Sequence, residues 1–386
     1  MKTVNVIIFF AIFFTVYGLV NYYIFIRGLQ AIPADAPWRA WYLPLFLFVS
    51  LAFIAGRFLE RAWLSAVSVS FVWVGAFWLA AMAYFFLAVV FLDLLRFVNW
   101  AVPFFPHSVT ANYPRAKLIA GVSIVSVVGL VVMGGALNAL FPEIRALEIT
   151  LPKRSDGPKT LRIVAASDIH LGTIIGRWRF SKIVDVINGE DPDLVLLAGD
   201  IVDEDLAPVI KANLGESLRS IRSKYGIYAI TGNHEYIGGA EEACRYLEEH
   251  GVRVLRDTVA RIPTGLTIAG REDRSIRQFS GKERRPLGEI LKGVDRTYPV
   301  ILMDHQPFGL DQAVVNGVDV QISGHTHHGQ LWPFNLITKA IYEISWGYAQ
   351  KGDTHFYVSS GVGSWGPPVR TGNRPEVVRL TLNLRP

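Results

Sequence analysis

The feature that most constrains the fold of this chain is a set of long apolar runs within its first 141 residues. Three runs reach the roughly 20 residues that a helix needs to cross a bilayer, and a fourth is shorter. They are Val4–Ile26, Trp41–Ala55, Leu64–Val98 and Leu118–Phe141. Tryptophan and tyrosine residues lie near the run ends, as in the interfacial belt of membrane proteins. The sequence therefore predicts an all-α transmembrane bundle of about four helices, and we assign residues 1–145 to it.

Composition supports a membrane protein over an ordinary soluble enzyme. Hydrophobic residues make up 51% of the 386 residues, and the mean hydropathy is +0.31. A cleaved signal peptide over residues 1–30 is an alternative for the first run, but that run is too long and further runs follow. The formal charge of +5 fits basic residues beside a membrane and anionic substrates. No nucleic-acid motif and no protein partner is evident, and the single Cys244 excludes an internal disulfide.

The orientation prediction rests on the positive-inside rule. Four spans place both ends of the bundle on one side, which carries Lys2, Arg57, Arg61, Arg145, Lys153 and Arg154. The opposite side carries Arg27, Arg39, Arg96, Arg115 and Lys117. This small excess favours the cytoplasmic side for the part of the chain that follows the bundle.

The pattern of apolar and polar residues changes after a predicted linker at 146–159. Short apolar runs typical of strands alternate with polar helical patterns over 160–386, which predicts an α/β domain. The strand-like runs are Leu161–Ala165, Leu194–Leu197, Gly226–Ile230, Leu266–Ala269, Val300–Met303, Val318–Ile322, His355–Val358 and Val377–Leu382. Helical patterns cover Arg179–Ile187, Leu206–Ser223, Ala240–His250 and Leu287–Lys292.

Polar motifs follow most of these strands, and they share one chemistry. Carboxylate, amide and imidazole ligands without cysteine suit two divalent metals that hold an activated water for phosphoester hydrolysis. The motifs are Asp168-x-His170, Gly199-Asp200-x-x-Asp203, Gly232-Asn233-His234-Glu235, His305 and Gly324-His325-x-His327. Asp200 is the natural bridging ligand, and His234 is free to act as a general acid. Any of these residues alone would suit a turn, a helix cap or a core histidine, so the prediction depends on the joint pattern.

In this order, the motifs resemble those of the calcineurin-like metallophosphoesterase superfamily, and the tail around Gly361–Gly363 and Pro375-Glu376 resembles its bacterial membrane-attached branch. The resemblance implies a pair of sheets flanked by helices, a four-layer αββα fold. It implies a first ion on Asp168, His170, Asp200 and His327, and a second on Asp200, Asn233, His305 and His325. His234 would protonate the leaving oxygen, and Asp203 would orient it. Mn²⁺ is the expected metal, with iron or Zn²⁺ as alternatives.

Two further residues are candidates for substrate contact. His328 replaces a glycine that is frequent in relatives, and it either touches substrate or caps its loop. Arg370 either approaches a substrate phosphate or forms a structural salt bridge. The segment Gly361-Val-Gly363-Ser-Trp-Gly366 matches the G-x-G-x-x-G motif of dinucleotide-binding loops. However, Pro367-Pro368 follows it, where a helix would have to begin. We interpret it as a glycine-rich loop near the metals.

Two surface segments have open interpretations. The basic segment Arg271–Arg285 is either a solvated loop or a site for anionic lipid head groups. The aromatic stripe Leu331–Trp346 is either core, or an apolar wall or membrane-dipping flap that receives acyl chains.

The predicted function is hydrolysis of a phosphoester or pyrophosphate on a lipid or lipid-linked substrate. A narrower alternative is a membrane-bound UDP-diacylglucosamine pyrophosphohydrolase of lipid A synthesis. An alternative of another class is a non-catalytic phosphate-binding sensor or transporter, which the nearly charge-free apolar runs disfavour.

Overall fold

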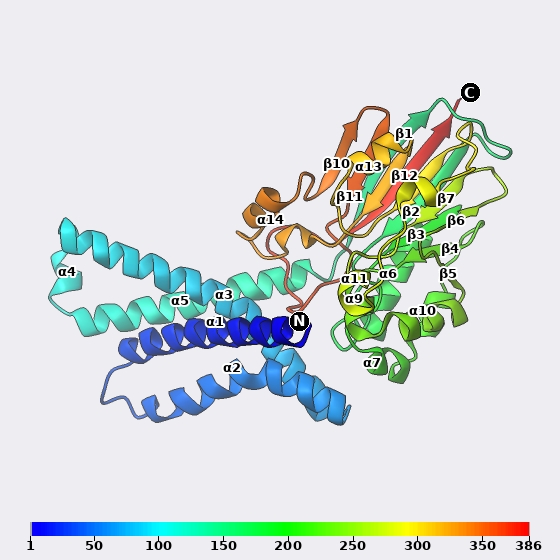
Figure 1. Cartoon of the computed structure of the whole chain (residues 1–386). Coiled ribbons are helices and arrows are strands. Elements are labelled where there is room, and N and C mark those ends of the chain that lie inside the picture. Colours follow the sequence, from blue (N-terminus) through cyan, green and yellow to red (C-terminus); the bar gives the residue numbers. More distant parts are fainter. Residues whose placement is uncertain (1, 386) are drawn as a thin grey trace. The chain divides into compact units, whose positions relative to one another are not determined.

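The computed structural model describes residues 2–385, which divide into two compact units, one up to residue 135 and one from residue 136. The first unit consists of long apolar helices (Figure 1). They are α1 Lys2–Ala31, α2 Arg39–Ala62, α3 Ala66–Ala101 and α5 Tyr113–Asn138, with the short α4 His107–Thr110 before the last. Each of the four long helices is long and apolar enough to cross a membrane. Each of the four predicted apolar runs overlaps one of them, which confirms the predicted bundle.

Small and polar residues explain two local features of this unit. Helix α3 begins with a capping box, in which Ser65 and Ser68 each accept a hydrogen bond from the other's backbone N–H. Helices α2 and α3 pack closely at Gly56, where an added Cβ would lie 2.6 Å from the backbone nitrogen of Val72. Small residues allow such close backbone approach between membrane helices.

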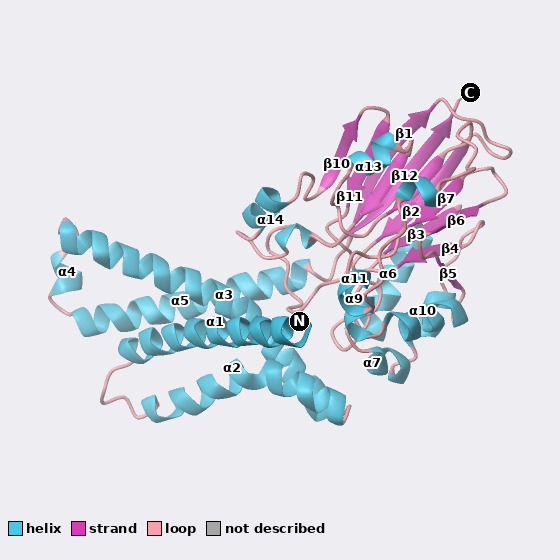
Figure 2. Cartoon of the chain, viewed as in Figure 1, coloured by secondary structure: helices cyan, strands magenta, loops and turns pink. Residues whose placement is uncertain are grey.

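The second unit contains two six-stranded sheets (Figure 2). One sheet has the strand order β1-β12-β2-β3-β4-β5, and the other has β10-β11-β9-β8-β7-β6. The strands of the first sheet are β1 Glu143–Leu151, β2 Thr160–Ala166, β3 Leu194–Ala198, β4 Ile227–Ile230, β5 Val252–Val254 and β12 Glu376–Leu384. Those of the second are β6 Thr258–Arg261, β7 Thr267–Gly270, β8 Val300–Met303, β9 Val320–Ser323, β10 Gly347–Lys351 and β11 Thr354–Val358.

The main core lies between the two sheets. One continuous cluster of buried residues includes Ile163 and Leu196 of the first sheet and Ile301 and Ile322 of the second. The connecting helices are α6 Arg177–Gly189, α7 Leu206–Lys211, α8 Leu214–Arg219, α9 Asn233–Gly238, α10 Ala240–Glu249, α11 Ile276–Phe279, α12 Leu287–Ile290, α13 Asp311–Val315, the 3₁₀ turn η1 His327–Gly329, and α14 Asn335–Ile341. All eight predicted strands are present, and the mixed α/β class is confirmed.

The structure differs from the sequence prediction in the linker and in one helix. Strand β1 pairs in parallel with β12 and occupies Glu143–Leu151, so the segment expected as a linker at 146–159 contains part of a strand. The predicted helix Leu206–Ser223 is two helices, because Asn213 between them has a left-handed backbone with φ of 50°. Short strands β5, β6 and β10 were not predicted.

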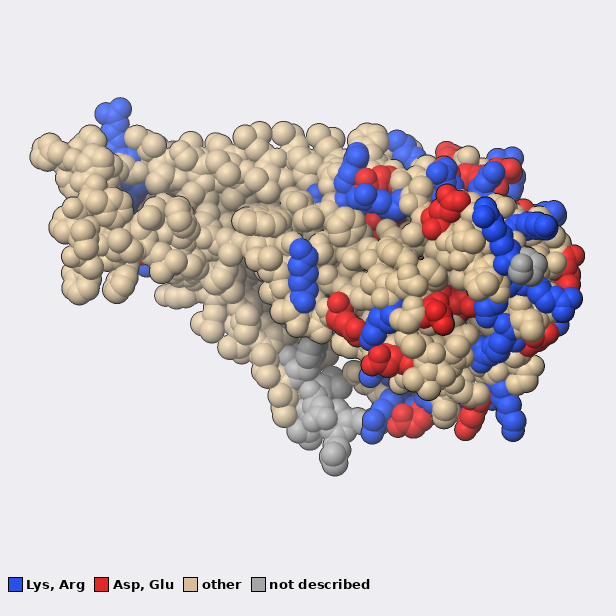
Figure 3. Space-filling view, turned by 90° about the horizontal axis from the view of Figure 1, so that it is seen from above, with Lys and Arg blue, Asp and Glu red and all other residues tan. Residues whose placement is uncertain are grey.

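The basic segment 271–285 is more ordered than a solvated loop. Arg271 is buried, and its guanidinium lies 3.3 Å from the carboxylate of Asp304. Arg284 contacts the same carboxylate at 2.6 Å. Both cations are thus already paired within the unit. Charged side chains gather over the second unit, whereas the surface of the apolar helices shows very few (Figure 3).

Cys244 lies inside α10, as expected of a structural thiol. It is buried, and burial raises the pKa of its thiol to about 12. A thiol with such a pKa is unreactive at neutral pH.

Candidate metal centre

The polar motifs meet at the carboxyl ends of parallel strands. Strands β2, β3 and β4 are parallel neighbours in the first sheet, and β8 and β9 are parallel neighbours in the second. Asp168 follows β2, Asp200 follows β3, Asn233 follows β4, His305 follows β8, and His325 follows β9. Loops at this edge of α/β sheets are where such folds place their chemistry. The two sheets thus bring the five motifs together.

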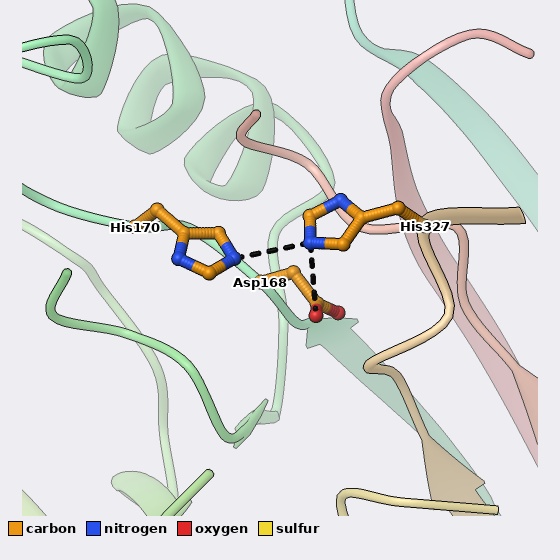
Figure 4. A group of neighbouring side chains, drawn as sticks. All are labelled: Asp168, His170 and His327. Atoms are coloured by element: carbon orange, nitrogen blue, oxygen red, sulfur yellow. Dashed lines mark hydrogen bonds and ion pairs between the residues drawn. The ribbon is translucent and has the colours of Figure 1, made fainter. Parts of the chain in front are cut away.

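One group of ligands consists of Asp168, His170 and His327 (Figure 4). The Nε2 of His327 lies 3.4 Å from Oδ1 of Asp168 and 3.1 Å from Nε2 of His170. All three side chains are buried. Burial and the neighbouring charges of His170 and Arg370 lower the pKa of His327 well below its usual range. The ring is therefore neutral, which is the form that binds a metal.

A second group consists of Asp200, His305 and His325. The Oδ2 of Asp200 lies 3.1 Å from Nε2 of His305 and 3.9 Å from Nε2 of His170 in the first group. One carboxylate oxygen thus faces both groups, as a bridging ligand must. That Asp200 binds both ions stays a prediction.

Two unsatisfied polar atoms show that these residues fit metal ions. Asn233 Oδ1 and His305 Nε2 are buried without a hydrogen-bond partner. The Nδ1–H of His305 is donated to the carbonyl of Ala198 at 2.8 Å, so Nε2 is the nitrogen that faces the carboxylate of Asp200. Two electron-rich atoms at 3.1 Å need a proton or a metal ion between them. Burial lowers the pKa of His305, but the charge of Asp200 outweighs burial and raises it well above the usual range.

The ligands are held by a strained backbone. Asp168, His170, Asp200, His325 and His327 all have positive φ, between 45° and 71°. Such conformations cost free energy in residues with a side chain, and they cluster at functional sites. Packing leaves no room for a larger residue at Gly324, where an added Cβ would lie 2.6 Å from Oγ of Ser167.

Glu235 has a role that the sequence reasoning did not assign. Its buried carboxylate accepts hydrogen bonds from the backbone N–H groups of Asp200, Ile201 and Val202 at 2.7–3.1 Å. It also accepts one from Gly232 at 2.7 Å. One carboxylate thus ties together the loops after β3 and β4. The position of Glu235 inside the Gly-Asn-His-Glu motif was the available signal.

The side chains of His234 and Asp203, the predicted general acid and its orienting group, lie in contact. His234 Nδ1 lies 3.1 Å from Oδ1 of Asp203, and the backbone N–H of His234 donates to Oδ1 of Asp200 at 2.9 Å. Burial lowers the pKa of His234, but the hydrogen bond to Asp203 and the charge of Asp200 outweigh burial and raise it to about 9. Both ring nitrogens of His234 are therefore protonated at neutral pH.

Arg370 is buried beside His327. Its guanidinium donates to the carbonyls of Gly363 and Ser360 and to Asn373 Oδ1, and its Nη2 lies 3.2 Å from Nδ1 of His327. Four of these contacts are donated hydrogen bonds, and none of the partners is a carboxylate. The salt bridge is thus not formed among the described residues, and a phosphate contact of Arg370 stays a prediction. Arg370 instead holds the glycine-rich loop against the first group of ligands.

The glycine-rich loop lies beside the ligands, as expected. Gly363 donates its backbone N–H to the carbonyl of Asp168 at 2.9 Å. Its carbonyl is one of those held by Arg370. No helix follows the loop before β12, so the motif is not a dinucleotide loop.

His328 is buried between Ser345 and Trp346. Its Nδ1 lies 3.3 Å from Oγ of Ser345, and its ring centroid lies 5.0 Å from that of Trp346. These contacts hold the loop that carries His327. A substrate contact of His328 stays a prediction.

The comparisons with known proteins agree with this centre. Residues 161–329 match the family model of the calcineurin-like phosphoesterases. The chain is 32% identical over 248 residues to a metallophosphoesterase of Aquifex aeolicus, covering 64% of this chain and 94% of that one. The chain belongs to the calcineurin-like metallophosphoesterase family. It is therefore a metal-dependent phosphoester hydrolase.

Two other relatives are similar to this chain, and the first match is long enough to include the membrane unit. A transmembrane protein with a metallophosphoesterase domain from Danio rerio is 28% identical over 378 residues, covering 92% of this chain and 83% of that protein. A Helicobacter pylori metallophosphoesterase is 32% identical over 247 residues, and the match covers 62% of this chain and 64% of its length. Together with four apolar helices, this similarity indicates a membrane protein.

Proposed function

We propose that this membrane metallophosphoesterase hydrolyses a phosphoester or pyrophosphate bond of a lipid or lipid-linked substrate. The observation that supports this proposal most is an exposed apolar surface directly beside the candidate metal ligands. Trp365 is 55% exposed, and its ring centroid lies 6.0 Å from that of His234. Helix α14 follows the turn η1 that holds His327, and its Leu336 and Ile337 are more than half exposed.

Hydrogen bonds join the two parts of this surface. The side chain of Gln330 donates to the carbonyls of Trp365 and Pro367 and accepts from the backbone N–H of Trp365. The backbone N–H of Trp332 donates to Oγ1 of Thr371. Because Leu336 and Ile337 are more than half exposed, the interpretation of the 331–346 stripe as core is wrong for these residues. We propose that these side chains receive the acyl chains of the substrate.

The same residues support a mechanism. Bound metals would lower the pKa of a water molecule and offset the charge of the phosphoryl oxygens. Asp168, His170, Asp200 and His327 would hold one ion, and Asp200, Asn233, His305 and His325 the other. His234 would donate its proton to the leaving oxygen, and Asp203 would keep the imidazole in that orientation. We propose Mn²⁺ as the metal and the cytoplasmic face of a bacterial inner membrane as the location of this unit.

The reaction class is tested with purified full-length protein loaded with Mn²⁺ and the soluble ester bis-p-nitrophenyl phosphate. The wild type and the exposed control Asp185→Asn should hydrolyse it, whereas Asp200→Asn should not. Hydrolysis by Asp200→Asn at the wild-type rate would contradict the mechanism.

The lipid substrate needs a separate test. A panel of phosphatidate, phosphatidylglycerol and a UDP-linked lipid is offered in detergent micelles, and the products are identified. Leu336→Gln with Ile337→Gln should lower kcat/KM for the cleaved lipid about 10-fold or more, since two apolar contacts are lost. Hydrolysis of the soluble ester should not change. Val315→Gln, a change at a residue 84% exposed in the same unit, is the control. Equal losses with both substrates would contradict the proposal, and release of UMP would favour the pyrophosphohydrolase.

A further inference from the structure

The membrane unit contains a cavity that the proposed hydrolysis does not use. It has a volume of about 690 Å³ and is lined by residues of α1, α2, α3 and α5. Most of the lining is apolar, including Phe46, Trp78, Phe85 and Val125. The volume lies in the range of about 300–1,000 Å³ that is usual for small-molecule sites.

A second cavity of about 480 Å³ adjoins the first. The two share Arg27, Asp93, Arg96, Phe105 and Tyr113 in their linings. Polar groups are more prominent in this second cavity, which also includes Asn99 and Thr110. One space is thus suited to hydrocarbon, and the space beside it is suited to a polar group.

The charges where the cavities meet favour an anion. Arg27 contacts Asp93 at 2.6 Å, and Arg96 contacts the same carboxylate at 3.3 Å. Lys117 also lines the apolar cavity, with its Nζ 5.7 Å from the ring centroid of Tyr113. Asp93 is the single acid among the described residues that line the two cavities, so three cations leave a formal charge of +2.

We propose that the paired cavities bind one anionic glycerophospholipid. Its acyl chains occupy the apolar cavity among the four helices, and its phosphate lies at Arg96 and Lys117 beside the Arg27–Asp93 pair. Such a lipid fills the space between α5 and the other helices, so it stabilises the arrangement of the bundle. This inference concerns the membrane unit, and it does not depend on which phosphoester the other unit cleaves.

Native mass spectrometry of the full-length protein in detergent tests this proposal. The protein is titrated with phosphatidylglycerol or with phosphatidylcholine of the same acyl chains. The wild type should bind one phosphatidylglycerol in preference to phosphatidylcholine. Arg96→Gln with Lys117→Gln should weaken this binding about 25-fold, or about five-fold for each cation removed. The double change leaves the Arg27–Asp93 ion pair intact, so it leaves no acid unpaired.

Two further variants separate this site from lipid bound elsewhere on the helices. Arg61→Gln removes an exposed cation of α2 outside both cavities, and it should bind phosphatidylglycerol as the wild type does. Ala120→Phe fills part of the apolar cavity without a change of charge, and it should reduce binding of both lipids. Equal wild-type affinity for the two lipids would overturn the proposal. An equal loss in Arg61→Gln, or unchanged binding in Ala120→Phe, would also overturn it.

Discussion

The carboxylate of Glu235 accepts a hydrogen bond of 3.1 Å from the backbone N–H of Asp200, the residue whose side chain faces both groups of metal ligands. The same carboxylate accepts three more backbone hydrogen bonds from the loops after β3 and β4. Glu235 therefore holds the backbone from which the Asp200 side chain extends, although Glu235 itself is not in either group of candidate ligands.

Glu235→Gln should reduce both stability and metal binding. A glutamine offers one acceptor oxygen in place of two, so buried N–H groups lose their partners at about 1–3 kcal/mol each. The free energy of unfolding, measured by urea denaturation of the metal-free protein, should fall by about 2 kcal/mol or more. Glu248→Gln, an exposed change on α10, should leave stability within about 0.5 kcal/mol. Equal stability of the two variants would refute this role of Glu235.

His234→Ala should lower kcat according to the leaving group. Loss of a general acid costs roughly 10²–10⁴-fold when the leaving oxygen needs a proton. The loss should be much smaller for p-nitrophenyl esters, whose leaving group departs as a stable anion. Asp203→Asn should follow the same pattern with a smaller loss, because Asp203 acts through His234. The measurement is kcat for an alkyl and a p-nitrophenyl ester, and identical losses for both would contradict the assigned proton transfer.

Asn138, the last residue of α5, belongs to the second unit and bonds to the loop behind the first group of ligands. Its Nδ2 donates to the carbonyls of Arg370 and Asn373 at 2.9 Å each. Arg370 and Asn373 in turn contact His327. Asn138→Leu should therefore weaken metal binding about 10-fold, as the loss of a group that orients a ligand does.

Calorimetric titration of the metal-free protein with Mn²⁺ measures this effect. Asn188→Leu is the matched control, since Asn188 also bonds to backbone groups with its side chain but lies in α6. Unchanged metal affinity in Asn138→Leu would show that the helix end does not position His327.

Removal of metal should destabilise the second unit. The candidate ligands are buried and close together only in the folded unit, so a bound ion stabilises the folded form over the unfolded chain. Saturation with a metal at about 100 times its Kd adds about 2.7 kcal/mol of stability. Chelation should therefore lower the Tm of this unit and abolish hydrolysis, and added Mn²⁺ should restore both. A Tm that does not respond to metal would argue against a buried centre.

The sequence predicted most of the fold because the decisive elements have simple patterns. Residues Leu194–Leu197 form an uninterrupted apolar run, and β3 is buried on both faces. Strand β1 was missed because its less exposed positions begin with the polar Glu143 and Arg145, and apolar residues are buried only toward its end, at Ile149 and Leu151. Strand β5 has three residues, too few for a periodic signal.

The sequence indicated which residues are candidate metal ligands, but it did not indicate which residues hold those ligands in place. Each ligand motif follows a buried strand, so the topology alone brings the motifs to one edge. The buried contacts of Arg370 depend on a loop that folds back over Asp168, and no local pattern encodes that path. The exposure of Leu336 and Ile337 likewise depends on what covers α14, which the residues of the stripe do not reveal.

The central claim is that one carboxylate, that of Asp200, serves two metal ions. Metal content by mass spectrometry of the purified, Mn²⁺-loaded protein tests it most directly, with Asp185→Asn as the control. The account predicts about two ions per chain in the wild type and in the control, and one or none in Asp200→Asn, with loss of hydrolysis. Two ions retained by Asp200→Asn with full activity would contradict it.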